Sequence, residues 1–456
     1  MQNLFDEVTT LDARCYHEFF LSEDILMEHA AEGMAAFIRE KFSKEAKITV
    51  VVGSGNNGAD GIALARLLHG DYKVALLHAK PPKSPMALLQ KKRADALGVP
   101  TLTQIEVCDV VVEAIVGTGF SGSFDEKITA LIAQMNMLEA YKIACDVPSH
   151  GYFADTTLTM GALKKSLFLD SQKDAVGAIE VIDLGLSRKL YEKESNWHLL
   201  DESDLKLPKR EKKDTHKGSF GHLAVISGEK VGASVLTALA ALRFGTGLVT
   251  LVGYEKEQLL HAPFSLMYGD KLPQTSSAIA VGMGLGNDLS TNELLNFLNN
   301  ELPLVVDADL FHMEIIKDIL KRKNIVLTPH PREFVALLQQ SGLAEISVSA
   351  LQQERFKYVE LFCRHYPHAT LLLKGANVII GQGEKFFINP HGSAKLAKGG
   401  SGDVLSGLIG ALLAQGYSTL HAAIHASLAH TQLAKNYNGA DFSLTPDDLI
   451  EGITKL

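Results

Sequence analysis

The sequence predicts an α/β protein of two domains, each built on a sheet with parallel strands. Two observations carry this prediction. Short apolar runs alternate with helix-like stretches along most of the chain, and a polar segment at residues 204–217 interrupts that alternation. The 456 residues suffice for two or three domains with their own cores. We therefore expect one domain at residues 1–205 and a second at residues 206–456.

The first domain begins with a helical pattern. Ser22 can cap a helix whose apolar residues recur at three- and four-residue spacing up to Phe37. The period then changes, and helical or glycine-rich segments separate short apolar runs at 47–53, 73–79, 110–117, 142–147 and 178–185. Such an order predicts parallel strands with helices on both faces, a Rossmann-like α/β/α sandwich.

The second domain repeats this alternation after the polar linker. A helix is expected at 233–244, and strand-like runs stand at 222–228, 248–253, 278–284, 302–309, 324–329, 370–375 and 377–381. The uncharged stretch 404–434 contains three histidines and a Gly-Tyr-Ser-Thr break. It therefore indicates two buried helices joined by a turn and argues against a membrane span.

Charge and cysteine content exclude several classes of protein. The chain has 44 Lys and Arg against 53 Asp and Glu, a net charge of −9, which disfavours a nucleic-acid partner. Its four cysteines lie far apart, which argues against a zinc site and a disulfide framework. No basic, apolar leader pattern opens the chain. We expect a cytoplasmic homo-oligomer that binds neither nucleic acid nor membrane.

A glycine-rich loop at residues 53–61 follows a strand and opens a helix. Its glycines allow a ligand to approach the backbone, and the helix N-terminus favours an anion there. The loop fits G-x-G-x-x-G, a weak signal by itself, but His78 stands where a dehydrogenase would offer an acid to the ribose. Asn56, Asn57 and Asp60 could hold a cation or a polar substrate, although such residues also occur in turns for local reasons.

Two further strand ends carry polar side chains. Glu113 lies in an otherwise apolar strand, and Asp146 and Ser149 follow the next one. Because the carboxyl ends of parallel strands meet at one crevice, these residues and Asn57 could surround a single pocket. The alternative for Asp146 is that it caps the following turn.

Four segments of this half, at 26–31, 55–61, 113–119 and 154–164, resemble the NAD(P)H-hydrate epimerases. The resemblance implies potassium held near Asn57, Glu113 and Ser149, and Asp146 as the proton-transfer group for the two C6 epimers. It also implies a site for the hydrated dinucleotide formed by Asn56, Asn57, Gly58, Ala59, Asp60, Gly117, Thr118, Gly119, Phe120, Ser121, Gly122, Ser123 and Asp146. The chain departs from the family pattern in having Glu113 for Asp, Ala59 for Gly, and His150 between Ser149 and Gly151.

The most specific segment of the second half is Gly399-Gly400-Ser401-Gly402-Asp403, which opens a helix. Successive backbone amides there can bind an oxyanion, and Asp403 stands where a base would meet a substrate hydroxyl. Phosphoryl transfer requires this combination. The alternative is a glycine-rich helix start at which Asp403 only complements the helix dipole.

Other positions of the second half could complete such a site. Lys374 lies between two strands, where it could line a nucleotide pocket or belong to a solvated hairpin. Asp307 and Asp309 could hold Mg²⁺ through water or cap a helix. His330 lies between prolines, which predicts a rigid, non-helical loop at 328–333.

These motifs, together with His216 to His222, resemble the ADP-dependent NAD(P)H-hydrate dehydratases, which have the ribokinase-like fold. The resemblance implies Asp403 as the catalytic base and Mg²⁺ with ADP as the phosphoryl donor. ADP would phosphorylate the C6 hydroxyl of S-NADHX or S-NADPHX, and elimination of phosphate would restore NAD(P)H. Substrate is expected near Ala233, Gly284 and His330, and nucleotide near Lys374, Gly375, Ala376, Asn377, Val378 and Gly402.

Two other functions compete with this interpretation. A small-molecule kinase of the same fold would release a stable phosphorylated alcohol. A nucleotide-sensing protein with one inactive half would bind nucleotide without needing Asp403. The fused first half argues against the kinase, because the dehydratase is expected to accept one epimer and the first domain would recycle the other.

Overall fold

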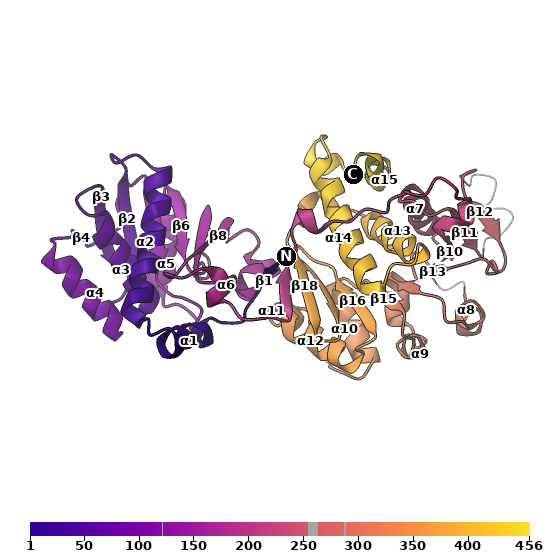
Figure 1. The fold of residues 1–456 in the computed structure, drawn as a ribbon, viewed down its shortest axis with the longest axis horizontal. Helices are drawn as coiled ribbons and strands as arrows, with labels where there is room; N and C mark the ends of the chain where they lie inside the picture. The colour runs from indigo at the N-terminus through magenta and orange to yellow at the C-terminus, as the bar shows by residue number, and fades with distance from the viewer. Residues whose placement is uncertain (121, 254–262, 287–288) are drawn as a thin grey trace. The chain divides into compact units, whose positions relative to one another are not determined.

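The computed structural model describes residues 1–120, 122–253, 263–286 and 289–456. This part of the chain forms two compact units, Gln2–Ser195 and Asn196–Leu456, the latter joined by Met1. Each unit contains a sheet with parallel strands and packed helices, which confirms the predicted fold class (Figure 1). The division falls between Ser195 and Asn196, earlier than the expected position 205, so residues 196–205 pack with the second unit.

The sheet of the first unit has the strand order β4-β3-β2-β5-β6-β7-β8, and every neighbouring pair is parallel. The strands of this unit are β1 (Gln2–Asn3), β2 (Lys47–Val52), β3 (Lys73–His78), β4 (Thr101–Leu102), β5 (Val110–Ala114), β6 (Tyr141–Cys145), β7 (Thr156–Met160) and β8 (Ala178–Ile182). The helices are α1 (Thr9–Glu18), α2 (Glu23–Lys41), α3 (Asn56–Leu68), α4 (Pro85–Ala96), α5 (Glu126–Met137), α6 (Arg188–Tyr191) and the 3₁₀ turns η1 (Lys165–Phe168) and η2 (Asp170–Gln172).

Two hydrophobic clusters lie on opposite faces of this sheet. One joins α1, α2 and α3 to the strands, and the other joins α5 to the opposite face. β2 alternates between them, because Val50 and Val52 belong to the first cluster and Val51 to the second. Ser22 caps α2 by accepting from the Ile25 amide at 3.3 Å, as predicted.

The second unit has the strand order β9-β18-β17-β16-β15-β14-β13-β10-β11-β12. The pairs β16–β17 and β17–β18 are antiparallel, and the other pairs are parallel. The strands are β9 (Trp197–Leu199), β10 (His222–Ile226), β11 (Leu248–Val252), β12 (Met267–Gly269), β13 (Ala278–Val281), β14 (Leu304–Val306), β15 (Ile325–Leu327), β16 (Ala369–Leu373), β17 (Val378–Gln382) and β18 (Lys385–Asn389).

Helices cover this sheet, and the predicted pair of buried helices is confirmed as α13 and α14 (Figure 1). No helix in the described ranges is long and apolar enough to cross a bilayer. The helices are α7 (Val231–Arg243), α8 (Thr291–Leu298), α9 (Ile316–Ile319), α10 (Pro331–Gln340), α11 (Val348–Gln353), α12 (Arg355–His365), α13 (Ser401–Ala414), α14 (Thr419–Asn436) and α15 (Pro446–Gly452). The 3₁₀ turns are η3 (Glu202–Asp204), η4 (Lys217–Phe220), η6 (Ala308–His312), η7 (Ala394–Leu396), η8 (Asp441–Ser443) and η9 (Ile453–Lys455).

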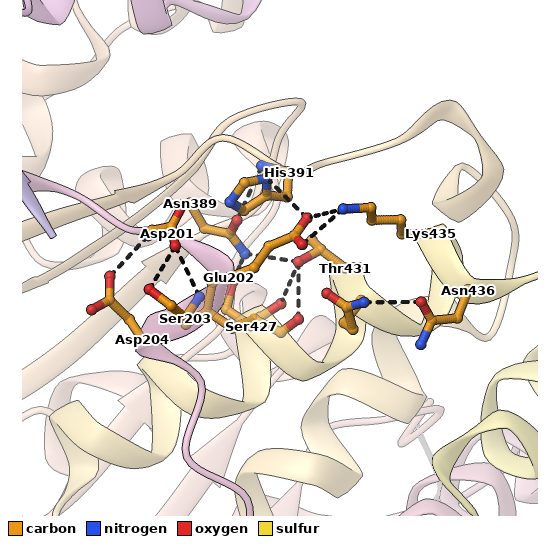
Figure 2. Close-up of polar contacts among 12 residues, drawn as sticks. Asp201, Glu202, Ser203, Asp204, Asn389, His391, Ser427, Thr431, Lys435 and Asn436 are labelled. Atoms are coloured by element: carbon orange, nitrogen blue, oxygen red, sulfur yellow. Dashed lines mark hydrogen bonds and ion pairs between the residues drawn. The ribbon is translucent and has the colours of Figure 1, made fainter. Parts of the chain in front are cut away.

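Residues 196–205 belong to the second unit because β9 extends its sheet beside β18. Trp197 stacks on Phe386 with ring centroids 4.6 Å apart, and its indole donates to Glu360 at 2.8 Å. Figure 2 shows the next residues, where Asp201 accepts from the Ser203 amide at 2.9 Å and the Glu202 carboxylate binds Lys435 of α14. The segment is thus attached by apolar and polar contacts.

We expect Gly407→Ala to destabilise the second unit. A Cβ at Gly407 would lie 2.3 Å from the Thr237 carbonyl oxygen and 2.8 Å from the Ala240 Cβ, where α13 contacts α7. Overpacking of this kind costs about 1–3 kcal/mol, measurable by urea unfolding. Gly232→Ala is the control, because nothing lies within 4 Å of that Cβ and alanine favours the helix. Equal stability of the two variants would contradict the close helix contact.

Candidate active sites

The first candidate site lies at the carboxyl ends of β2, β5 and β6. Glu113 of β5 is fully buried, and Oε2 accepts from the Ser149 amide at 2.9 Å. Oε1 accepts from the Ser149 hydroxyl and from the Ile115 amide, both at 2.7 Å. Burial raises the pKa of Glu113 to about 7, while these hydrogen bonds favour the carboxylate. The structure therefore brings two of the three predicted potassium ligands into direct contact.

Asn57, the third predicted potassium ligand, stands at the start of α3. Its side chain is buried, and Nδ2 donates to the Val116 carbonyl at 2.8 Å. Its Oδ1 is buried and has no hydrogen-bond partner within the described part of the chain. A buried carbonyl oxygen without a donor is costly unless a ligand meets it. Asn57 therefore fits a cation, and a cation would also offset the buried charge of Glu113.

Asp146 follows β6 in the left-handed region, with φ +71°. A non-glycine residue is rare in this conformation, and functional sites are where it is most often retained. Oδ1 forms an ion pair with Lys164 and accepts from the Met160 amide at 3.1 Å. Lys164 has no exposed side-chain surface, and it also donates to the Thr159 hydroxyl and the Met160 carbonyl, both at 2.9 Å. The buried lysine thus orients the Asp146 carboxylate.

Gly117 lies between the predicted potassium ligand Asn57 and the Asp146 carboxylate. A Cβ there would lie 3.5 Å from the Asn57 Cβ and 3.6 Å from Oδ2 of Asp146. Asp60, one turn into α3, interacts electrostatically with Asp146. Burial and the charges of Asp146 and Asp12 raise the pKa of Asp60 well above its usual range. Asn57, Gly117, Asp146 and Asp60 therefore surround one region.

The remaining predicted residues of the first site differ in exposure. Gly58 and Ala59 are buried in α3. Asn56 is exposed, and Nδ2 of its side chain donates to the Glu23 carboxylate at 2.7 Å. Phe120 stacks on Phe124 with ring centroids 4.8 Å apart. Ser121 lies outside the described residues. The other loop residues, which are exposed, are Thr118, Gly119, Gly122 and Ser123.

The second candidate site centres on the first turn of α13. Gly400 adopts φ +89° just before the helix, and no side chain caps it. The first amides of a helix lack partners within the helix, so they form a site for an anion. A Cβ on Gly402 would lie 3.5 Å from Nζ of Lys374. The structure therefore brings Lys374 to Gly402 and Asp403 of α13, although Lys374 lies outside that helix.

Lys374 ends β16 and is held by two acids. Nζ lies 2.8 Å from Oδ1 of Asp307 and 3.7 Å from Oε2 of Glu333. Burial lowers the pKa of Lys374, but the charges of Asp307, Glu333 and Asp403 outweigh burial and raise it overall. Oδ2 of Asp307 accepts from the Ser406 hydroxyl at 2.8 Å. Lys374 is thus a fixed cation beside the α13 N-terminus.

The pKa of Asp403 is raised well above that of an ordinary aspartate. Burial and the charge of Asp307 raise the pKa of Asp403 to about 7, although Lys374 acts in the opposite direction. A carboxyl group with this pKa can accept a proton at neutral pH and release it again. This is the ionisation expected of a general base.

Asp307 and Asp309 each accept a hydrogen bond from a backbone amide. Oδ1 of Asp307 accepts from the Ala308 amide at 2.9 Å, so Asp307 caps η6 in addition to binding Lys374. Oδ2 of Asp309 accepts from the Gly286 amide at 2.9 Å. Within the described ranges, no group of three or more His, Cys, Asp or Glu side chains is placed to hold a metal ion. Asp307 therefore caps η6, and the binding of Mg²⁺ through water remains a prediction.

The other predicted residues of the second site lie on the surrounding elements. Gly284 (φ +64°) lies beside α7, since a Cβ there would be 3.0 Å from the Ala233 Cβ. His330 caps α10, because Nδ1 accepts from the Arg332 and Glu333 amides at 3.1 and 3.2 Å. The expected non-helical loop at 328–333 is confirmed for residues 328–330 and was wrong for 331–333, because Pro331 is the first residue of α10, where proline is favourable. The turn after Lys374 comprises exposed Gly375, partly buried Ala376, and buried Asn377 and Val378.

Comparison with known proteins identifies the family. A model of the NAD(P)H-hydrate dehydratases matches residues 223–455, and a model of the YjeF-related protein N-terminus matches residues 23–166. The bifunctional NAD(P)H-hydrate repair enzyme Nnr of Helicobacter pylori is 40% identical over 476 residues and covers 100% of both chains. The chain belongs to the bifunctional NAD(P)H-hydrate repair enzymes.

Two further relatives are less similar to this chain. The Escherichia coli enzyme of the same name is 31% identical over 89% of this chain and 83% of its own length. A solved ADP/ATP-dependent NAD(P)H-hydrate dehydratase from Bacillus subtilis is 26% identical and covers 55% of this chain and 92% of that one, with a TM-score of 0.47.

Sequence reasoning missed several residues of the two sites in this family member. Lys164 was part of the segment that signalled the family, and a lysine after an apolar strand could have indicated a buried partner for Asp146. Asp12 of α1 also went unnoticed; its Oδ1 accepts from the Tyr191 hydroxyl at 2.7 Å. No local pattern marks that contact, because 179 positions separate the two residues.

Proposed function

We propose that the unit Gln2–Ser195 interconverts R- and S-NAD(P)H hydrate, and that Asn196–Leu456 dehydrates the S form with ADP. The observation that carries this proposal is Asp403, whose pKa is about 7, beside the uncapped α13 N-terminus and the fixed cation Lys374. A base, an oxyanion cradle and a positive charge are the components that phosphoryl transfer needs. Membership of the repair-enzyme family supports both halves of the proposal.

In the second site, Asp403 accepts the proton of the C6 hydroxyl. The hydroxyl oxygen then forms a bond to the β-phosphorus of ADP as the bond to AMP breaks. The C6–O bond next breaks with loss of a C5 proton, which releases phosphate and restores the dihydropyridine. The α13 amides and Lys374 stabilise the transferring phosphoryl group, and Gly402 leaves room for it. Mg²⁺ would be held by the nucleotide phosphates, by water and by one or two carboxylates, for which Asp307 and Asp309 are the candidates.

In the first site, Asp146 transfers the proton needed to interconvert the C6 epimers. Lys164 keeps the Asp146 carboxylate oriented, and Gly117 leaves space for the ring of the hydrated nicotinamide. Asn57, Glu113 and Ser149 would hold potassium, because they combine a buried carbonyl oxygen that lacks a donor with a buried carboxylate. When bound, potassium would neutralise the charge of Glu113.

Potassium is expected to raise the Tm of the wild-type protein, and Asn57→Leu should abolish this response. The variant removes Asn57 Oδ1, the buried oxygen that accepts no hydrogen bond within the described part of the chain. At about ten times its Kd, potassium should add ~1.4 kcal/mol, or a Tm rise of about 3–5 °C. Thermal unfolding in KCl and in tetramethylammonium chloride measures the difference. Asn56→Leu is the matched control, since Asn56 is exposed and should leave the response intact. A full response in Asn57→Leu would rule out this ligand set.

The whole proposal is tested by following reduced-nicotinamide absorbance after ADP and Mg²⁺ are added to a mixture of both hydrate epimers. Complete recovery of NAD(P)H supports both activities, and recovery of the S fraction alone indicates an inactive epimerase half. A stable phosphorylated alcohol among the products would instead favour the small-molecule kinase. Nucleotide binding without any conversion would favour the sensing protein.

A further inference from the structure

His430 lies where α14 contacts the first turn of α13. Its Nε2 lies 3.1 Å from the Ser401 hydroxyl, and both side chains are buried. Ser401 is the first residue of α13 and directly precedes Gly402 and Asp403. The hydrogen bond therefore joins α14 to the residues that form the proposed phosphoryl site, although His430 is remote from them in sequence.

Two other contacts fix the same turn from different directions. The Thr237 hydroxyl of α7 donates to the Asp403 carbonyl at 3.0 Å. Gly400 packs so closely that a Cβ would lie 2.5 Å from Pro446 and 2.9 Å from Leu236. The hydrogen bond of His430 to the Ser401 side chain is a third contact at this turn, between the two that fix Gly400 and the Asp403 backbone.

The helix that carries His430 is itself firmly attached. Nδ2 of Asn389 in β18 donates to the Ser427 hydroxyl at 3.0 Å and to the Thr431 hydroxyl at 3.2 Å, all within the core (Figure 2). Lys435, one turn further along α14, binds Glu202. Ser427, Thr431 and Lys435 recur every fourth residue and so share one face of the helix. α14 is thus held in place while His430 reaches α13.

We propose that His430 is a positioning residue for phosphoryl transfer, which through Ser401 holds the α13 amides and Asp403 in the orientation that the phosphoryl group requires. This inference rests on the proposed dehydratase function. It assigns a role to a buried side chain that acts through Ser401.

The ionisation of His430 is consistent with this role. Burial lowers the pKa of His430 to about 4, and the charge of Lys374 acts in the same direction, while a hydrogen bond with the Ser401 backbone opposes them. His430 is therefore neutral at pH 7. A neutral imidazole fixes the serine hydroxyl and adds no positive charge of its own beside Lys374.

The same helix supplies a matched control. His425 is also buried on α14, and burial likewise lowers its pKa to about 4. Its Nδ1, however, accepts from the backbone amide of Lys206 at 3.3 Å, which lies outside α13. Substitutions at His425 and His430 therefore remove similar side chains from one helix, and only one of them reaches the phosphoryl site.

The test compares His430→Asn, His430→Gln, Ser401→Ala and His425→Asn in the full-length protein. We expect His430→Asn to lower kcat/KM for ADP by about 10- to 100-fold, because a small displacement of catalytic groups has effects of this size. His430→Gln can place an amide near the Nε2 position and should retain most of the activity. Ser401→Ala should match His430→Asn, with no further loss in the double variant, and His425→Asn should stay near wild type. Calorimetric titration with Mg²⁺ and ADP should show weaker binding only for the variants that break the Ser401 contact.

The inference is overturned if His430→Asn and His425→Asn lower kcat/KM equally, or if Ser401→Ala keeps wild-type kcat/KM. The Ser401 variant decides the question even if His430→Asn fails to fold, because it removes a single oxygen. Absence of ADP-dependent dehydration in the wild-type protein would refute the proposed function instead, so the two failures are distinguishable.

Discussion

Asp403→Asn is expected to lower kcat of the ADP-dependent dehydration by about 10²- to 10⁴-fold. Asparagine has nearly the same shape as aspartate but cannot accept the proton of the C6 hydroxyl. The α13 amides and Lys374 remain in place in the variant, so ADP binding should persist. Steady-state kinetics on the S hydrate measure the loss, and calorimetric titration with ADP checks that the site is still formed.

The pH profile gives a second measure of the same residue. Burial and the charge of Asp307 raise the pKa of Asp403 to about 7, so the base is protonated and inactive below that pH. The kcat/KM of the wild-type dehydratase should rise as the pH passes through about 7 and level off above it. A flat profile between pH 5 and 9, or an asparagine variant with wild-type kcat, would exclude Asp403 as the base.

Asp146→Asn should abolish the epimerase while leaving the dehydratase intact. The substitution removes the carboxylate that Lys164 orients, and the rate of epimerisation should fall by at least about 10²-fold. With a mixture of hydrates, ADP and Mg²⁺, NAD(P)H should recover rapidly up to the S fraction and only slowly beyond it. The rapid phase serves as an internal control, because it reports the second unit of the same molecules.

Lys164→Met tests whether orientation of that carboxylate matters. Methionine fills a similar volume without the charge, so Asp146 would lose its ion pair and the slow phase should again be retarded. An unchanged slow phase in Asp146→Asn would remove Asp146 from the reaction. An unchanged slow phase in Lys164→Met alone would restrict the lysine to a structural role.

Local patterns predicted much of the fold. Apolar runs marked β2, β5, β10 and β16 because buried parallel strands are apolar on both faces. The uncharged stretch became α13 and α14 because its break falls at Gly416, where φ is +88°. β9 was not predicted, since its three residues form a strand only by pairing with β18, which lies far along the chain.

The sites were predictable only in part, for a related reason. Glycine-rich turns and acids at strand ends are local signals, and they indicated Asn57, Asp146 and Asp403. The partners of these residues are set by tertiary packing. Lys374 and Asp307 are 67 positions apart and form their ion pair only when β14 and β16 stand in one sheet. The sequence therefore could not show that Asp307 binds Lys374.

The place of Trp197 has a practical consequence for separating the two halves. A recombinant polypeptide starting at residue 206 would lack β9, and β18 would become an open edge with the ring of Phe386 uncovered. Exposed hydrophobic edges of this kind promote aggregation. Expression of the dehydratase half by itself should therefore start before Trp197.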